Sequence, residues 1–155
     1  MTIITKLAVA AAFALPSLAS AENLVASDPD TLLEFFVEEG GDVERTVDNA
    51  GDPKLKVEYY GSDFVLYFYD CTDNTDCKSI QFFSGYKTEG GVRKSKVNSW
   101  NADNRFARAY ISESGSARIE HDLYLGNVGI DADDFAALVA KWTKAEAEFE
   151  EFIDW

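Results

Sequence analysis

Residues 64–86 read FVLYFYDCTDNTDCKSIQFFSGY, two apolar runs separated by a polar loop that carries a cysteine near each end. The first run, 64–69, is nearly continuous in apolar residues. Such a run is typical of a central strand buried on both faces, or of a strand whose outer face is covered by aromatic side chains. The second run, 80–86, predicts another strand. Because the loop between them is rich in turn-forming residues, we expect the two strands to pair as an antiparallel hairpin.

Cys71 and Cys77 are the only cysteines of the chain. In an oxidising compartment so close a pair is expected to form a disulfide, which would staple the turn and stabilise the fold by about 2 kcal/mol. A redox-active dithiol is the alternative, but the pair lacks the C-x-x-C spacing and a basic residue beside the first thiol. The nearby Asp70, Asp73 and Asp76 do not follow the spacing of a calcium-binding EF-hand loop, so we interpret them as a solvated acidic turn.

The N-terminal segment 1–21 has the pattern of a secretory signal peptide. Lys6 precedes the apolar run 7–15, and small residues follow up to the predicted cleavage site between Ala21 and Glu22. The protein is therefore expected in the periplasm or outside the cell, with no stable membrane anchor after cleavage. An N-terminal membrane anchor is the alternative, although the apolar run is shorter than a bilayer span requires.

The rest of the chain, 22–155, is predicted to form a single domain. The predicted helices cover 28–39, 92–104 and the residues after Asp131, and the predicted strands cover 43–47, 55–59, 64–69, 80–86, 106–111 and 117–125. The order α-β-β-β-β-α-β-β-α contains no repeated strand–helix–strand unit. It therefore predicts an α+β fold with an antiparallel sheet and flanking helices rather than a parallel sheet.

The chain has 155 residues, which is the size of one ordinary domain, and its formal net charge is -14. So acidic a chain is a poor match for a phosphate backbone, and no nucleic-acid partner is expected. Basic residues gather in one region, the basic patch, which consists of Lys87, Arg93, Lys94, Lys96, Arg105 and Arg108. We interpret the patch first as compensation of acidic neighbours. A docking site for an acidic partner segment is the alternative.

His121 is the only histidine of the chain, and strand alternation places it on the same face as Ile119 and Leu123. We interpret it as a core or edge histidine with one hydrogen bond rather than as a catalytic base. One histidine cannot build a histidine-rich zinc site, and the chain carries no nucleotide-binding or hydrolase motif, so no metal, cofactor or catalytic residue is expected. A periplasmic hydrolase that uses acidic residues with His121 is the alternative.

Residues 98–110, NSWNADNRFARAY, are the most distinctive stretch of the chain, and we call them the signature segment. The chain resembles the YbjN family, described as bacterial sensory transduction regulators. The resemblance rests on this segment and on Gly51-Asp52-Pro53, the Cys71–Cys77 hairpin, Glu120-His121-Asp122 and Trp142, and it covers nearly all of 22–155. Two positions depart from the family pattern. His121 stands where an apolar residue such as Met is expected, and segment 126–129 is looser than the usual glycine pair.

The resemblance implies a fold similar to that of type III secretion chaperones, in which helices flank a curved antiparallel sheet. It also implies a non-enzymatic binding or regulatory role, chaperone-like or in envelope sensing. The partner would be an unknown protein or peptide held on a sheet face or an exposed edge, and a homodimer is left open. A structural envelope protein is a further alternative.

The signature segment has two interpretations. In the structural one, Trp100 fills the core, Asn98 and Asn101 bond the backbone where helix meets strand, and Arg105 pairs with a helix carboxylate. In the functional interpretation, the same part of the chain forms the rim of a site that binds a peptide or protein segment. The residues concerned are Asn98, Trp100, Asn101, Arg105 and Phe106.

Overall fold

The computed structural model describes residues 23–155, and its elements follow the predicted order. The helices are α1 (Pro29–Glu38), α2 (Lys94–Asp103) and α3 (Ala132–Ile153). The strands are β1 (Asp42–Val47), β2 (Pro53–Tyr59), β3 (Ser62–Tyr69), β4 (Ser79–Tyr86), β5 (Arg108–Ile111) and β6 (Ala117–Tyr124). The α+β class is confirmed. The predicted signal peptide, 1–21, lies outside the described residues.

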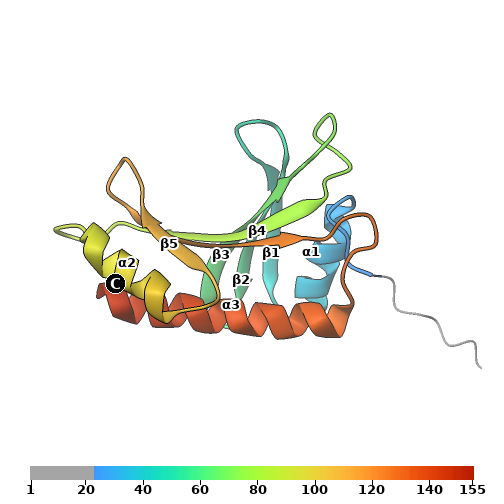
Figure 1. Cartoon of the computed structure of the whole chain (residues 1–155). Coiled ribbons are helices and arrows are strands. Elements are labelled where there is room, and N and C mark those ends of the chain that lie inside the picture. The colour runs from blue at the N-terminus through green and yellow to red at the C-terminus, as the bar shows by residue number, and fades with distance from the viewer. Residues whose placement is uncertain (1–22) are drawn as a thin grey trace, which may run out of the picture.

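Within residues 23–155, one antiparallel sheet of six strands forms the centre of the fold, in the order β1-β2-β3-β4-β6-β5. The three described helices lie on one face of this curved sheet, with α3 along its length and α1 and α2 towards its two ends (Figure 1). We call the opposite face the open face, because no helix of the described chain covers it. Hairpin turns rise above the open face near both ends of the sheet (Figure 1).

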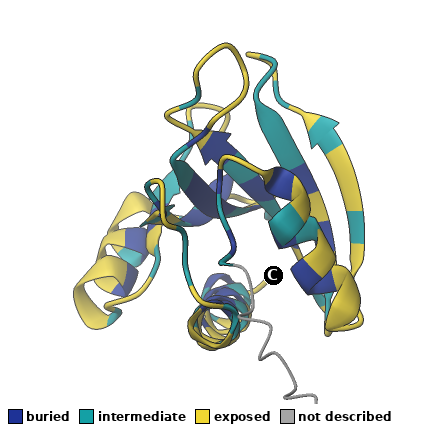
Figure 2. Ribbon diagram, turned by 90° about the vertical axis from the view of Figure 1, so that its right-hand side faces the viewer, coloured by how far each residue is buried: buried dark blue, intermediate teal, exposed yellow. Residues whose placement is uncertain are grey.

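The alternation of side chains along β3 decides which of them reach the core. Phe64, Leu66 and Phe68 are buried beneath the helices, whereas Tyr67 and Tyr69 belong to the open face. Of the two predicted alternatives, β3 is therefore the strand whose outer face is covered by aromatic side chains, and not a strand buried on both faces. Figure 2 shows the same division in the whole molecule, with buried residues gathered between the sheet and the helices.

The long helix α3 closes the core. Its N-cap is Asp131, whose carboxylate accepts a hydrogen bond from the Asp133 amide, as expected for an aspartate at this position. On its buried face the Trp142 ring packs against the rings of Phe64 and Phe82, with centroid distances of 6.0 and 5.5 Å. Aromatic contacts of this kind add to the stabilisation from apolar burial.

The boundaries of β5 and β6 differ from those predicted. β5 begins at Arg108 rather than at residue 106, because Ala107 has a φ of 62° and this left-handed conformation interrupts the extended chain. β6 ends at Tyr124 rather than at 125. The chain leaves the ladder there because the Leu125 amide bonds the Lys78 carbonyl, which lies outside β4.

The predicted disulfide between Cys71 and Cys77 is present in the turn between β3 and β4. This turn is also tied to the neighbouring turn between β1 and β2. The Asn74 side-chain amide donates to the Ala50 carbonyl at 3.2 Å and to the Asp52 carboxylate at 2.8 Å. The two turns at this end of the sheet are therefore held together.

Candidate binding surface on the open face

Five strands contribute side chains to a row on the open face, which we call the aromatic–cation row. It consists of Lys54, Tyr67, Phe83, Arg118 and Tyr110, from β2, β3, β4, β6 and β5 respectively. Lys54 Nζ lies 5.9 Å from the Tyr67 ring centroid, and the Tyr67 and Phe83 centroids are 5.5 Å apart. The Arg118 guanidinium carbon lies 5.5 Å from the Phe83 centroid and 5.9 Å from that of Tyr110. Cations at these distances are attracted to the rings, so the row is held in place by its own contacts.

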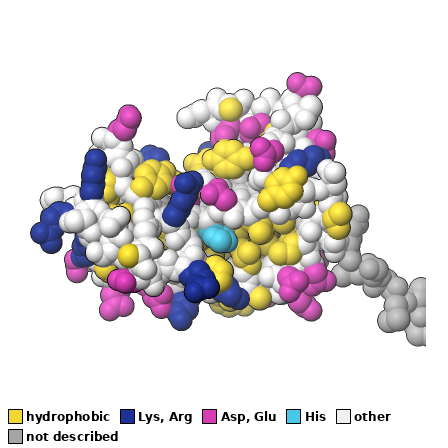
Figure 3. All heavy atoms as spheres, viewed as in Figure 1, with side chains coloured by type: hydrophobic (Ala, Val, Ile, Leu, Met, Phe, Trp, Pro, Cys, Tyr) yellow, Lys and Arg dark blue, Asp and Glu magenta, His cyan; other side chains and the backbone are white. Residues whose placement is uncertain are grey.

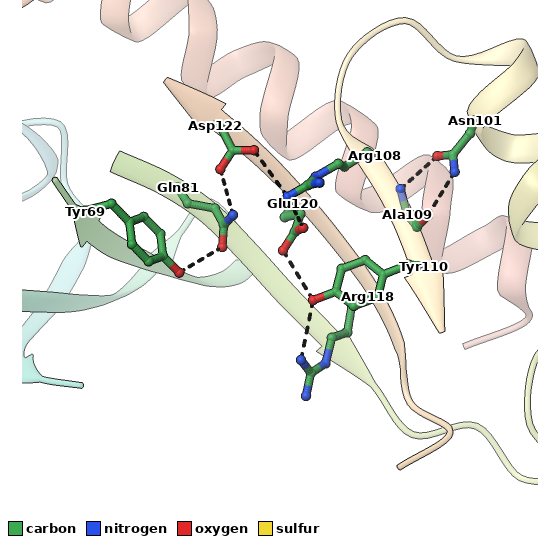
Figure 4. A network of polar contacts seen from close by, with 9 residues as sticks. All are labelled: Tyr69, Gln81, Asn101, Arg108, Ala109, Tyr110, Arg118, Glu120 and Asp122. Carbon is green, nitrogen blue, oxygen red and sulfur yellow. Dashed lines mark hydrogen bonds and ion pairs between the residues drawn. The ribbon is translucent and has the colours of Figure 1, made fainter. Parts of the chain in front are cut away.

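A hydrogen-bonded network crosses the sheet beside this row (Figure 4). The Tyr69 hydroxyl donates to Gln81 Oε1 at 3.4 Å, and Gln81 Nε2 donates to Asp122 Oδ1 at 2.7 Å. Arg108 Nη2 lies 2.6 Å from Glu120 Oε1 and 3.4 Å from Asp122 Oδ2. Side chains from four strands therefore restrain one another.

Tyr110 joins the network to the row. Its hydroxyl donates to Glu120 Oε2 and accepts from Arg118 Nη1, each at 3.4 Å. The Glu120 side chain is only 7% exposed, and this burial raises the pKa of its carboxyl, whereas the nearby Arg108 guanidinium acts to lower it. Because these side chains are already ordered, the protein would lose less rotamer entropy when a ligand binds on the open face.

Aromatic area stays accessible on the open face. Tyr124 is 73% exposed and Tyr69 is 41% exposed, and the rings of the aromatic–cation row are half-buried. A groove of about 540 Å3 lies on the same face over β1 to β4. Tyrosine and arginine are enriched among the residues that carry binding energy at protein interfaces. The open face thus has the composition of a protein-binding surface.

Trp100 and Asn101 of the signature segment make the contacts that the structural interpretation predicts. Trp100 is buried, with its ring centroid 5.1 Å from that of Phe149. Asn101 Nδ2 donates to the Ala109 carbonyl at 2.9 Å, and the Ala109 amide donates to Asn101 Oδ1 at 2.8 Å. Because β5 is an edge strand, the Asn101 side chain occupies backbone groups that another strand could otherwise bond.

Asn98, Arg105 and Phe106 are placed differently. Asn98 is exposed and makes no side-chain hydrogen bond to residues 23–155, because it faces solvent on α2. Arg105 is also exposed and lacks the expected ion pair within the same range. Phe106 is 47% exposed, and its ring lies 6.3 Å from the His121 ring. The signature segment is therefore divided between the core, the β5 edge and the surface around His121.

The fold and these contacts can be set beside known proteins. Residues 28–155 match the YbjN family model, described as "Putative bacterial sensory transduction regulator". The chain belongs to the YbjN family. No curated protein and no solved structure matches it. YbjN is a regulator-type family rather than a known enzyme family, which supports a regulatory or protein-binding role. The expected likeness to type III secretion chaperones stays a prediction.

In this YbjN protein the basic patch is divided by the fold. Lys96 Nζ pairs with Asp154 Oδ2 at 2.7 Å, and Arg108 belongs to the open-face network, so these two residues fit the interpretation of charge compensation. The other four are exposed and form no ion pair with described residues: Lys87, Arg93, Lys94 and Arg105.

His121 lies on the helix side of β6, half-buried, and desolvation lowers the pKa of its imidazole. Its ring makes no hydrogen bond to the described residues, in contrast to the one bond expected. The described residues that line the cavity beside it include no serine, threonine or cysteine.

In this YbjN chain from residue 23 onward, no group of three or more side chains is arranged to hold a metal ion, and no helix has the length and apolarity to cross a bilayer.

The sequence alone does not single out the aromatic–cation row or the hydrogen-bonded network beside it. Alternation places Glu120, Asp122 and Tyr124 on one face of β6, but only the pairing of β6 with β4 and β5 brings Gln81 and Arg108 beside them. Aromatic residues at alternate positions of neighbouring strands are the signal that could have identified this YbjN surface.

Proposed function

We propose that this YbjN protein is an exported regulatory module that binds a protein partner on the open face of its sheet. The observation that carries the proposal is the aromatic–cation row on a face that the described helices leave uncovered. The row combines flat apolar area with fixed positive charge, and the adjoining network adds carboxylates. A protein segment of mixed charge with exposed apolar side chains matches this pattern.

The edges of the sheet are less suited to a partner. Asn101 occupies part of the β5 edge, and β1 carries Glu44 and Arg45 on its edge, with Arg45 paired to Asp30 of α1. Two copies could pair β1 with β1 in an antiparallel arrangement that keeps the helices of both copies on the same face of the joined sheet. Pairing centred on a middle residue of β1 would then place Glu44 opposite Glu44, or Arg45 opposite Arg45. Like charges directly opposite are destabilising. A homodimer through this edge is therefore disfavoured.

Export is supported by the leader pattern of 1–21, and it would place the Cys71–Cys77 pair in an oxidising compartment, where disulfides persist. Intact-mass measurement of protein from a periplasmic fraction tests this part separately. We expect an N-terminus at Glu22, and a full-length cytoplasmic product would contradict export.

Photo-crosslinking in cells tests the binding surface. A photoreactive amino acid at Tyr67, Phe83 or Tyr124 should give adducts with the same protein, because all three positions belong to the open face. Lys144 and Glu148 are exposed on α3, on the other side of the molecule, and serve as matched control positions. Identical adducts at control and open-face positions would contradict the proposal.

The identified partner then allows a titration by calorimetry. We expect Arg118→Ala and Tyr124→Ala each to weaken binding about tenfold or more, the effect typical of an interface hot spot. Lys144→Ala should leave the Kd unchanged. If neither open-face substitution changes the Kd, the partner binds elsewhere.

A further inference from the structure

A second feature lies on the helix side of the sheet, away from the open face. It is a cavity of about 260 Å3 between α3 and β6, and its walls include Phe106, His121, Leu138, Lys141 and Trp142. The residues from α3 recur at helical spacing and form one wall, while β6 and the connection from α2 to β5 form the other. Most of the lining is apolar, as is usual for a small-molecule site.

Two local features keep this space unfilled. The α3 wall carries alanines, Ala137 and Ala145, where larger side chains would occupy the cavity. On the opposite wall Ala107 has a φ of 62°, an uncommon conformation for a residue with a Cβ, and it precedes the turn of the chain into β5. The Phe106 ring beside it lies against the His121 ring and stays half exposed at the cavity.

The polar groups of the cavity have weak partners or none within the described chain. The His121 ring makes no hydrogen bond there, and Lys141 Nζ has only a long contact of 3.5 Å to the Ala137 carbonyl. Asp134 lies two helical turns before Lys141, about 10 Å away along the axis. The α3 wall of the cavity therefore has an acidic residue at its N-terminal end, a cation one turn before its other end, and apolar residues along most of its length.

Basic side chains and an apolar patch adjoin the cavity on the surface. Figure 3 shows the single imidazole with basic side chains and an acidic side chain close to it, a hydrophobic patch on one side, and further acidic side chains beyond that patch. A ligand whose head is negative and whose tail is apolar matches this order, with the head at Lys141 and His121 and the tail along Leu138 and Trp142.

We propose that this cavity binds a small amphiphilic carboxylate, with its carboxylate at Lys141 and His121 and its hydrocarbon tail between α3 and Phe106. The volume of about 260 Å3 lies just below the range of sites for drug-sized ligands, so the cavity suits a smaller ligand. A neutral imidazole can donate one hydrogen bond, and an ammonium group supplies a charge-assisted one. The site is independent of the open face.

The test uses three probes with the same tail: heptanoate, heptan-1-ol and heptylammonium. Titrations followed by NMR of the purified, disulfide-bonded protein should show heptanoate perturbing the His121 and Trp142 signals with a Kd on the order of 1 mM. The neutral and cationic probes should bind about five- to tenfold more weakly. Equal or tighter binding of heptylammonium, or no perturbation by heptanoate at 10 mM (roughly tenfold above that Kd), overturns the proposal.

Matched variants separate the cavity from the rest of α3. Lys141→Gln should weaken heptanoate binding about five- to tenfold and leave heptan-1-ol unaffected, whereas Lys144→Gln should change neither. Ala137→Leu should abolish binding of all three probes by filling the cavity mouth, and Ala140→Leu is its control, since Ala140 is exposed outside the cavity. Both leucines stand at exposed helical positions, so circular dichroism should show unchanged folding. Undiminished binding in Ala137→Leu places the ligand elsewhere and overturns the proposal.

Discussion

Replacing Glu146 by glutamine should make the protein more stable at neutral pH, although the change removes a charged group from α3. The Glu146 side chain is buried, with 2% of the residue exposed. Its Oε1 accepts hydrogen bonds from the Ser84 hydroxyl and, at 3.3 Å, from the Tyr86 hydroxyl. Its Oε2 is buried and has no partner among the described atoms. Glutamine keeps the acceptor towards Ser84 and Tyr86 and places a neutral amide where the second carboxylate oxygen lies.

The magnitude follows from the pKa. Burial, the largest cause, raises the pKa of the Glu146 carboxyl from 4.5 to about 6, even though the hydrogen bond from Ser84 acts in the opposite direction. The folded protein therefore holds this proton at a pH where the unfolded chain has already released it. Between these two pKa values stability falls as the pH rises. A rise in pKa of about 1.5 corresponds to about 2 kcal/mol of destabilisation of the folded protein. This destabilisation is present in full above pH 7 and absent below pH 4.

Urea unfolding of the wild type and of Glu146→Gln between pH 4.5 and 7.5 measures this effect. The free energy of unfolding of the variant, minus that of the wild type, should increase by up to about 2 kcal/mol across this range. Glu148→Gln, at an exposed position of the same helix, is the control, and it should stay within about 0.5 kcal/mol of the wild type. A difference between Glu146→Gln and wild type that does not depend on pH would refute the reasoning.

Substitutions at three further positions test contacts around β5. Asn101→Ala should lower the free energy of unfolding by about 1–2 kcal/mol, because two hydrogen bonds to the Ala109 backbone are lost, and hydrogen exchange at the Ala109 amide should accelerate. Arg108→Ala should destabilise the protein by about 1–3 kcal/mol in urea unfolding and raise the pKa of Glu120 further, since a buried carboxylate loses its cation. Trp100→Ala should cost about 3–5 kcal/mol because it empties a core position, whereas Trp100→Phe should cost less, since the indole nitrogen has no partner to lose within residues 23–155.

Much of the fold could be predicted because its signals are local. Asp131 caps its helix through a hydrogen bond two residues away, and β6 alternates within eight residues, so short windows of sequence contain the information. The start of β5 could not be predicted in this way. Nothing in the local sequence indicates that Ala107 adopts a left-handed conformation, because alanine rarely does so. The packing around Ala107 imposes this conformation.

The candidate site depends on contacts that local pattern does not specify. The expectation for Asn101 matches the structure because the residue lies in the last turn of α2, close to β5 in the same stretch of chain. The ion pair expected for Arg105 is not formed with the described residues, because the direction of the Arg105 side chain depends on how α2 packs against the sheet. The aromatic–cation row is less predictable still. It requires the register of four strand pairs, and the β4–β6 pair joins residues far apart in sequence.

The strand order determines how this protein can loosen without unfolding. Since β6 lies between β4 and β5, the four-residue β5 can detach while the ladder of the other five strands stays paired. Because Asn101 lies on α2, which Trp100 anchors in the core, the two bonds between Asn101 and Ala109 break when β5 detaches. Peeling of β5 is therefore a partial unfolding that breaks these two bonds, releases Arg108 from Glu120 and lets water reach the carboxylate.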